Sequence, residues 1–338
     1  MGAAEIRIHS ILARADAVDV EGEKDVRTKD VIEAGEKIRW DALVRAAGVH
    51  DKARLRGLTE IREFAGCGKM SREWFEGAPS QALDTRFSNE EFESRTGRRL
   101  GVKLNEEKPC PFCFQIMDEY GAHAEGCMGG GDRVLLHNEF RDSTHRQARS
   151  GGTQLELEKQ GLLGELGWPE LVGRRPADTL LCNTVGVRTA SRRQWPRVAL
   201  DIGFVCPQAL SHVAGAAMES LAAARAYTAK KRSHNDTDRR CQEVHIDYQP
   251  LVVETFGGAT EEAVDVIESL NQLVAVNTHT PHREVARRFW QRVSVDMQRA
   301  LHRAWARRTG VRRELAVDHA GRAMAVAWLL TLREGGSN

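Results

Sequence analysis

Three cysteines and one histidine stand close together in the sequence, with spacings typical of a metal site. Cys110, Cys113, His123 and Cys127 follow the pattern C-x2-C-x9-H-x3-C. A C-x2-C pair can direct two thiolates at one metal, and a His and a Cys four residues apart share one face of a helix. Three soft thiolates and an imidazole suit tetrahedral Zn2+ and leave no position for water. The spacing therefore predicts a structural zinc site.

Two other interpretations of this cluster remain open. The three cysteines could be buried free thiols beside an unrelated histidine, or His137 could take the place of His123 as the fourth ligand. Seven cysteines in 338 residues are too few for a disulfide scaffold. The crowding of three of them within residues 110–127 indicates a metal in a reducing compartment.

A second group of candidates consists of two acids near predicted strands. Asp178 directly precedes a strand expected at 179–187, and Asp201 lies inside one expected at 197–206. Two carboxylates on neighbouring strands can hold Mg2+, which activates water and neutralises charge on a scissile phosphate. Taken alone, an Asp before a strand is usually a turn residue, and an Asp within a strand usually faces solvent.

Further charged residues could join the same edge of the sheet. Lys230 and Lys231 end the following predicted helix and could stabilise developing negative charge. Glu156 and Glu158 lie on the preceding predicted helix and could add a carboxylate.

The elements that must position these residues follow from the periodicity of the sequence. In 197–206, apolar Val198, Leu200, Ile202 and Phe204 alternate with other residues, so Asp201 should point away from the apolar face. Helices are expected over much of 1–65, after Ser88 or Asn89 as N-cap, and at 132–149, 153–164, 208–232 and 260–275. An extended segment is expected at 244–256, broken at Pro250. This order predicts one sheet covered by helices, an α/β fold.

The composition excludes several classes of protein. Hydrophobic residues make up 41% and charged residues 29%, an ordinary globular balance, and the net charge is only +1. A uniformly basic nucleic-acid coat protein is excluded, whereas a basic patch on one face is not. No run of 18 apolar residues and no secretory signal is visible, so we expect a nuclear or cytoplasmic protein without a membrane span.

Residues 281–313 form a strongly basic segment with ten arginines, opposed by Glu284 and Asp296, a net charge of about +8. Arginine pairs with phosphate, and the interleaved Trp290 and Trp305 could stack on bases. Alternatively, the segment is an amphipathic helix whose tryptophans face the core. Both hold if opposite faces of the helix serve the two roles.

The order of these motifs resembles the C-terminal region of reverse-transcriptase-type proteins from non-LTR retroelements, over about residues 78–310. That region carries a CCHC zinc motif followed by a restriction-like endonuclease of the PD-(D/E)XK class. The likeness rests on the cysteine cluster and on later motifs: Gly129-Gly130-Gly131-Asp132, His137-Asn138, Arg141-Asp142, Arg175-Pro176-Ala177-Asp178, Leu200-Asp201-Ile202-Gly203, Tyr227 through His234, and Val253 through Gly258.

The resemblance implies a PD-(D/E)XK-like mixed sheet flanked by helices. It implies that Asp178 and Asp201 bind Mg2+ or Mn2+, that Lys231 is the catalytic lysine with Lys230 as runner-up, and that Glu158 is the helix glutamate of the nuclease core. Two departures are visible. An alanine separates Pro176 from Asp178, and Gly203 replaces the lysine expected two residues after the second acid, so catalysis would depend on a relocated lysine.

These interpretations combine into one expected organisation of the chain. We expect a helical N-terminal segment (1–105), a zinc module with its following helix (106–149), an endonuclease core (150–277) and a basic helical tail (278–338). The expected function is metal-dependent cleavage of DNA, with Arg175, Arg303, Arg307 and Arg308 as nucleic-acid contacts. RNA and a reverse transcriptase of the same element are further expected partners. The rivals are a catalytically inactive nucleic-acid-binding module and an unrelated α/β protein with a zinc clip.

Overall fold

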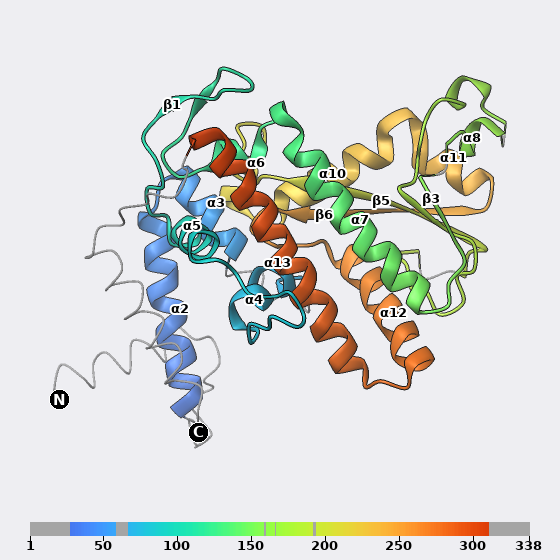
Figure 1. The fold of residues 1–338 in the computed structure, drawn as a ribbon, viewed down its shortest axis with the longest axis horizontal. Coiled ribbons are helices and arrows are strands. Elements are labelled where there is room, and N and C mark those ends of the chain that lie inside the picture. Colours follow the sequence, from blue (N-terminus) through green and yellow to red (C-terminus); the bar gives the residue numbers. More distant parts are fainter. Residues whose placement is uncertain (1–27, 59–66, 159, 166, 192–193, 311–338) are drawn as a thin grey trace, which may run out of the picture.

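A mixed four-stranded sheet forms the centre of the fold. The structure, a computed structural model, describes residues 28–58, 67–158, 160–165, 167–191 and 194–310. The strand order is β3 (Leu155–Leu157), β4 (Thr179–Leu181), β5 (Arg197–Val205) and β6 (Ile246–Glu254) (Figure 1). The β3–β4 and β4–β5 pairs are antiparallel, and the β5–β6 pair is parallel. The expectation of a helix-flanked α/β sheet is therefore confirmed.

Helices cover both faces of this sheet. On one face, α7 (Asp132–Ser150), α12 (Glu261–Thr278) and α13 (His282–Thr309) bury a cluster that includes Leu200 and Ile202 of β5. On the other face, α10 (Ala222–Ser233) packs against Val205 and Val252, and α11 (Thr237–Glu243) packs against β6. The predicted alternation in β5 is correct, because Val198, Leu200, Ile202 and Phe204 all join the first cluster.

Short helices and a small hairpin precede the sheet. The N-terminal helices are α2 (Thr28–Ala46), α3 (Val49–Leu58), α4 (Lys69–Glu76) and α5 (Asn89–Leu100). Ser88, one of the two residues predicted as N-cap, caps α5 and forms a capping box: its hydroxyl accepts from the Glu91 N–H, and the Glu91 carboxylate accepts from the Ser88 N–H. The antiparallel pair β1 (Lys108–Pro109) and β2 (Ile116–Met117) leads into α6 (Ala122–Gly126).

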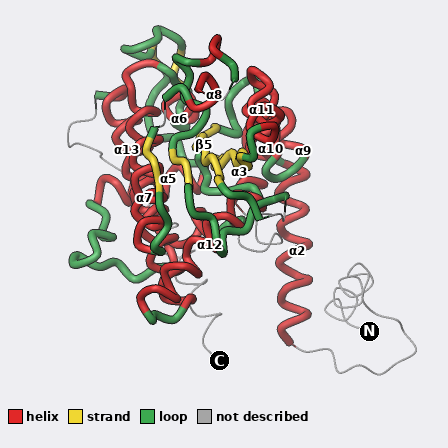
Figure 2. Tube along the Cα trace, turned by 90° about the vertical axis from the view of Figure 1, so that its right-hand side faces the viewer, coloured by secondary structure: helices red, strands yellow, loops and turns green. Residues whose placement is uncertain are grey.

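The basic segment forms one long helix that ties the other parts together. Helix α13 packs against α4, α5, α6, α7 and α12 (Figures 1 and 2). Trp290 and Trp305 are both buried, so the expectation of a core-facing amphipathic helix holds for its tryptophans. In the described ranges, no helix combines the length and the apolar character needed to cross a membrane.

The predicted helix at 153–164 is wrong. Residues 155–157 instead form β3, and only the short helix α8 (Leu162–Glu165) follows. The Leu155-Glu156-Leu157-Glu158 run alternates with the period of a strand, and its pairing with β4 overrides the helix propensity of Leu and Glu. Glu158 therefore lies just after a strand, with φ of 48°, and is not a helix glutamate.

Three further predicted elements differ from the structure: one helix is divided, one strand is not interrupted, and one strand is shorter than expected. The helix predicted at 208–232 is two helices, α9 (Val213–Met218) and α10, because α9 packs on α3 whereas α10 packs on the sheet. Pro250 does not interrupt β6, which pairs continuously with β5. As an edge strand, β6 tolerates a proline where the missing N–H would point away from its neighbour. The strand predicted at 179–187 ends at Leu181.

One buried carboxylate joins the zinc module to the rest of the protein. Glu125 on α6 accepts hydrogen bonds from Arg95 at 2.7 Å, from Arg98 at 3.1 Å and from the Thr255 hydroxyl at 2.8 Å. Its side chain is fully buried. Arg95 also donates to Gln298 of α13. Helices α5, α6 and α13 and the end of β6 therefore meet at one charged cluster.

Replacing Glu125 with alanine should lower the free energy of unfolding by about 3–5 kcal/mol, because two buried guanidinium groups lose their counterion. Urea unfolding measures the change. The matched control is Glu119→Ala, which removes an exposed partner of Lys103 and should leave the unfolding free energy nearly unchanged. Equal effects of the two substitutions would contradict this role of Glu125.

The same carboxylate predicts a pH dependence. Burial acts to raise the pKa of Glu125, but the charges and hydrogen bonds of Arg98 and Arg95 hold that pKa below its usual value. Its stabilisation is therefore present above the unfolded-state pKa and is lost as the pH falls through the lowered folded-state pKa. The Glu125→Ala protein should lose less stability than the unsubstituted protein over this acidic range.

Candidate metal centre and candidate active site

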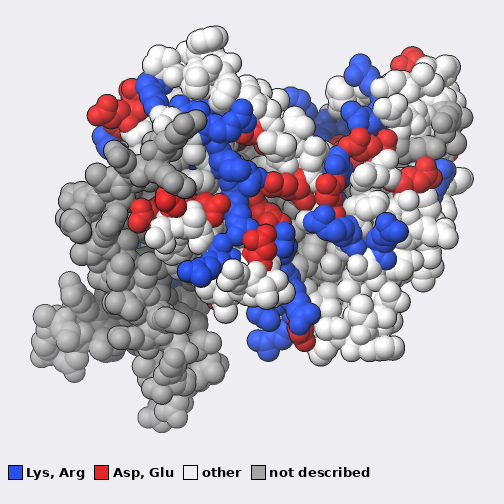
Figure 3. Space-filling model, viewed as in Figure 1, with Lys and Arg blue, Asp and Glu red and all other residues white. Residues whose placement is uncertain are grey.

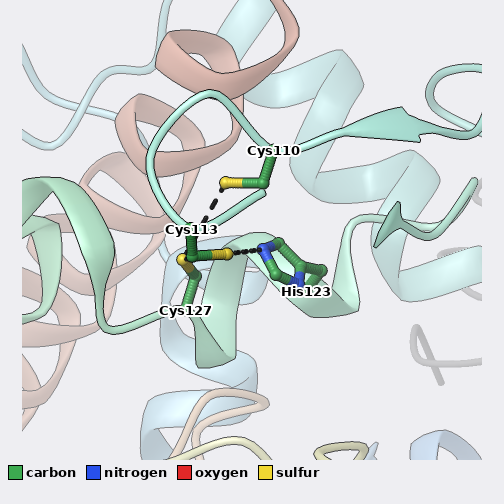
Figure 4. Close-up of side chains that lie close together, drawn as sticks. All are labelled: Cys110, Cys113, His123 and Cys127. Carbon is green, nitrogen blue, oxygen red and sulfur yellow. Dashed lines mark hydrogen bonds between the residues drawn. The ribbon is translucent and has the colours of Figure 1, made fainter. Parts of the chain in front are cut away.

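The four predicted zinc ligands converge on one point (Figure 4). Their donor atoms all lie within 4.8 Å of one another. The Sγ atoms of Cys113 and Cys127 are 3.6 Å apart, and those of Cys110 and Cys127 are 4.0 Å apart. Tetrahedral Zn–S bonds of about 2.3 Å place two sulfurs about 3.8 Å apart. The donor set and its spacing therefore fit a structural zinc ion.

Local backbone structure brings these ligands together. Cys110 and Cys113 lie in the turn between β1 and β2, where the Phe114 N–H donates to the Cys110 carbonyl at 2.9 Å. His123 lies in α6 and Cys127 directly follows it. The Asp118 carboxylate accepts from the N–H groups of Tyr120, Ala122 and His123 at 2.6–3.0 Å. It thereby satisfies the free donors at the start of α6 and orients the helix that carries His123.

The thiol pKa of Cys110 differs from the thiol pKa values of buried cysteines outside the cluster. Burial opposes ionisation of Cys110, but hydrogen bonds from the backbone of Phe112 and Cys113 lower its pKa to about 6. Burial raises the pKa of Cys67 and Cys241 to about 12 and that of Cys206 to about 11. Since metals bind thiolates, Cys110 is the cysteine of this comparison that is suited to a metal.

His137 is not a member of the cysteine cluster. Its Nε2 atom lies 2.9 Å from Oδ2 of Asp178, on the side of the sheet that α7 covers. Burial acts to lower the pKa of His137, but the hydrogen bond and charge of Asp178 raise that pKa above its usual value. The structure therefore leaves His123 as the histidine of the zinc cluster and places His137 at the second candidate site.

Asp178 and Asp201 both lie against the middle of β5. Asp178 comes directly before β4, and its N–H donates to the Leu200 carbonyl at 2.9 Å. Its Oδ2 accepts the N–H of Ile202 at 2.7 Å. Because β4 begins only at Thr179, no residue of β4 pairs with the Ile202 N–H. The Asp178 carboxylate takes the place of a backbone acceptor. Asp178 is close enough to Asp201 for its negative charge to act on the pKa of Asp201.

Two side chains hold the Asp201 carboxylate in place. Lys231 of α10 donates to Oδ1 at 2.6 Å, and the Tyr248 hydroxyl of β6 donates to Oδ2. Gly203 makes room for this lysine, because a Cβ atom at 203 would lie 2.7 Å from Cε of Lys231 and 2.8 Å from the Tyr227 ring. The Lys231 side chain thus occupies the space that a side chain at position 203 would fill.

The pKa values of the two carboxylates are shifted in opposite directions. Burial acts to raise the pKa of Asp178, but His137, the Ile202 N–H and Lys231 together hold it below its usual value. Burial raises the pKa of Asp201; Lys231 opposes this shift, and the negative charge of Asp178 adds to it. Two acids in neighbouring positions with differing pKa values are a recurrent property of catalytic sites.

Glu158 lies beside this pair in an ion-pair bridge. Its N–H donates to the Asp178 carbonyl at 2.9 Å, and its carboxylate binds Arg141 of α7 and Arg175, the latter at 2.7 Å. The Arg175 side chain is about half exposed. Glu158 therefore connects a surface arginine to the backbone of Asp178.

The arginines of α13 differ in exposure. Arg303 and Arg307 are partly exposed, although they pair with Glu139 and Asp132. The Arg308 side chain is fully buried and binds Asp132 at 2.7 Å and the Gly129 carbonyl at 2.6 Å. A phosphate could not reach Arg308 without displacing these groups. Figure 3 shows the Lys and Arg side chains on this face gathered in a band over α13.

Sequence reasoning missed two residues of the carboxylate site. Tyr248 was not considered, although its place in the extended segment after the lysine-bearing helix was a usable signal. His137 was considered as an alternative zinc ligand and as part of a motif, but not as a partner of Asp178, because it lies nearer to the cysteines in the sequence. The third residue near the site, Arg141, was noted only as part of a motif.

Comparisons with known proteins identify no family. No protein-family model matches the chain, and no curated protein matches it.

Replacing Cys113 with alanine should abolish stoichiometric zinc binding and lower the temperature of unfolding, because metal binding contributes directly to the stability of such modules. Metal analysis by mass spectrometry measures the zinc content. The matched control is Cys241→Ala, which removes a buried cysteine outside the cluster and should keep one zinc per chain. A full zinc equivalent in the Cys113→Ala protein would refute the assignment.

Proposed function

We propose that the chain is a metal-dependent endonuclease that cleaves phosphodiester bonds in DNA, with a PD-(D/E)XK-like core. The supporting observation is the group formed by Asp178, Asp201 and Lys231: Lys231 of α10 binds Asp201 of β5, and the N–H of Ile202, the residue after Asp201, binds the Asp178 carboxylate. A mixed sheet with helices on both faces is compatible with such a core. A lysine bonded to the second acid also agrees with the relocated lysine that the resemblance implies.

The carboxylates fit a hard divalent cation in their chemistry. Carboxylate oxygens are the preferred ligands of Mg2+ and Mn2+. Oδ1 of Asp178 has no hydrogen-bond partner among the described residues, whereas both oxygens of Asp201 are engaged. Asp178 and Asp201 would hold the ion, and a bound Mg2+ would supply Lewis acidity and a more acidic water.

The side chains of this chain would have distinct parts in hydrolysis. Water would attack the phosphorus in line, a new P–O bond would form, and the bond to the leaving oxygen would break. The Lys231 ammonium would neutralise charge that develops on the phosphoryl oxygens. Tyr248 would fix the orientation of Asp201, and the Ile202 N–H and His137 would fix that of Asp178. Arg175 would bind a flanking phosphate beside the site.

A second function is favoured by the same contacts. Lys231 already neutralises Asp201, and His137 already bonds to Asp178. A site whose acids are internally paired is also what a catalytically inactive, zinc-stabilised nucleic-acid-binding module would contain. Activity measurements separate the two proposals.

Replacing Lys231 with methionine should lower the rate of Mg2+- or Mn2+-dependent DNA nicking by at least about 100-fold, since one charge that acts on the transition state is worth several kcal/mol. The control is Lys230→Met on the exposed neighbouring position of the same helix, which should nick at the unsubstituted rate. Asp201→Asn should abolish nicking. If the unsubstituted protein binds DNA and nicks nothing with either metal, the inactive-module proposal replaces this one.

Replacing Arg303 and Arg307 with glutamine should flatten the dependence of DNA affinity on salt concentration by up to about 2 units of the log–log slope, because each phosphate contact releases condensed counterions. Fluorescence anisotropy over a salt series measures the slope. Arg308→Gln should instead lower the unfolding temperature, because it leaves Asp132 partly unpaired inside the protein. An unchanged slope in the double variant would remove α13 from the binding surface.

A further inference from the structure

The zinc module carries an aromatic side chain that contributes little to the fold. Phe114 is 81% exposed, belongs to no hydrophobic cluster, and forms no ring pair with another described residue. Its backbone has φ of 61°, in the left-handed region that favours glycine. This conformation turns the chain back after Cys113, and the carbonyl of the next residue, Gln115, accepts the Cys110 N–H at 2.8 Å. Glycine would satisfy the turn with less strain, so the ring brings a cost and no internal contact.

The neighbouring Phe112 shows what an inward-facing ring does in the same turn. A Cβ atom added to Gly129 would lie 2.8 Å from the Phe112 side chain, and one on Gly130 would lie 3.0 Å from it. The guanidinium groups of Arg307 and Arg308 lie over the Phe112 ring at 5.0 and 5.1 Å. Phe112 therefore packs the zinc module onto α13, whereas Phe114, two residues later, faces solvent.

Other exposed apolar side chains accompany Phe114 on the zinc module. Ile116 of β2 is 61% exposed, and Met128, directly after the last zinc ligand, is 77% exposed. Arg133 donates to the Met128 sulfur at 3.1 Å. Single exposed apolar residues are common on proteins, so these three indicate a contact surface only in combination with the charge beside them.

Positive charge borders this surface. Arg307 and Arg308 share the single carboxylate of Asp132, and Arg307 is the exposed member of this group. Arg133 and Lys108 donate to the backbone carbonyls of Phe204 and Thr309. In Figure 3, the uncharged cap in the position of the β1–β2 module adjoins one end of the basic band over α13, and acidic side chains lie on its other side.

We infer that Phe114 stacks on an unpaired base of a single-stranded nucleic acid whose backbone follows the basic band of α13. A flat ring stacks on any base, and the adjacent arginines attract the phosphates, which is the combination used by single-strand-binding surfaces. An apolar protein partner would not require the bordering cations. Trp290 and Trp305, the rings that the sequence suggested for this role, are buried. The inference rests on the proposed action on nucleic acid but does not require cleavage.

The test measures binding by the full chain with its zinc retained and with no added Mg2+ or Mn2+. Fluorescence anisotropy follows a labelled single-stranded DNA of about 20 nucleotides and the same strand annealed to its complement. Phe114→Gly should weaken single-strand binding about tenfold, the effect of one lost stacked base, and weaken duplex binding less than about twofold. Phe114→Trp, which keeps an aromatic ring at this position, should bind single strands as the unsubstituted protein does. Because glycine relieves the strained backbone, the unfolding temperature of Phe114→Gly should not fall.

Two control variants test whether the effect is specific to the Phe114 ring. Val276→Ala, at an exposed apolar position on α12, should bind as the unsubstituted protein does, and Phe112→Ala should lower the unfolding temperature. Unchanged single-strand affinity in Phe114→Gly overturns the inference, as does an equal loss for both DNA forms. Absence of single-strand binding by the unsubstituted protein also overturns it. Phe114-dependent binding without any metal-dependent nicking supports the inference and counts against the endonuclease alone.

Discussion

The buried carboxylate of Glu125 is the contact on which the arrangement of the other parts depends. It lies on α6, between His123 of that helix and Cys127 directly after it. It binds Arg95 and Arg98 of α5 and Thr255, which follows β6. Arg98 also binds Gln208, which donates to the His50 carbonyl of α3. Zinc ligation and this ion-pair cluster therefore restrain the same short helix. A five-residue helix has little stability of its own, so each restraint depends on the other.

The carboxylate site depends in turn on how helices cover the sheet. His137 reaches Asp178 from α7 on one face, and Lys231 reaches Asp201 from α10 on the other. Helix α10 packs closely because its sheet-facing residues are small, Ala223 and Ala224 among them. The absence of a side chain at Gly203 then allows the lysine to approach the strand. Position 203 and position 231 are thus coupled, since filling one would displace the other.

Helix α13 connects the zinc module to the core and carries charge on its outer side. Its buried side includes Trp290, Trp305 and Arg308, and its exposed side includes Arg303 and Arg307. Asp132 begins α7 and pairs with both Arg307 and Arg308, close to the glycines that follow the last zinc ligand. Direct contacts therefore join the segment after the zinc cluster, the start of α7 and the end of α13.

The sequence by itself determined the features that arise from local spacing. The candidate zinc ligands, the N-cap of α5, the alternation in β5 and the position of α12 all depend on residues near one another in the chain, whose geometry follows from helix and strand periods. The strand β3, the division between α9 and α10 and the continuity of β6 through Pro250 were decided by pairing and packing across long sequence distances. The same holds for Tyr248 and His137 at the carboxylates and for the burial of Arg308. No local period contains that information, because each of these contacts joins segments that only the folded chain brings together.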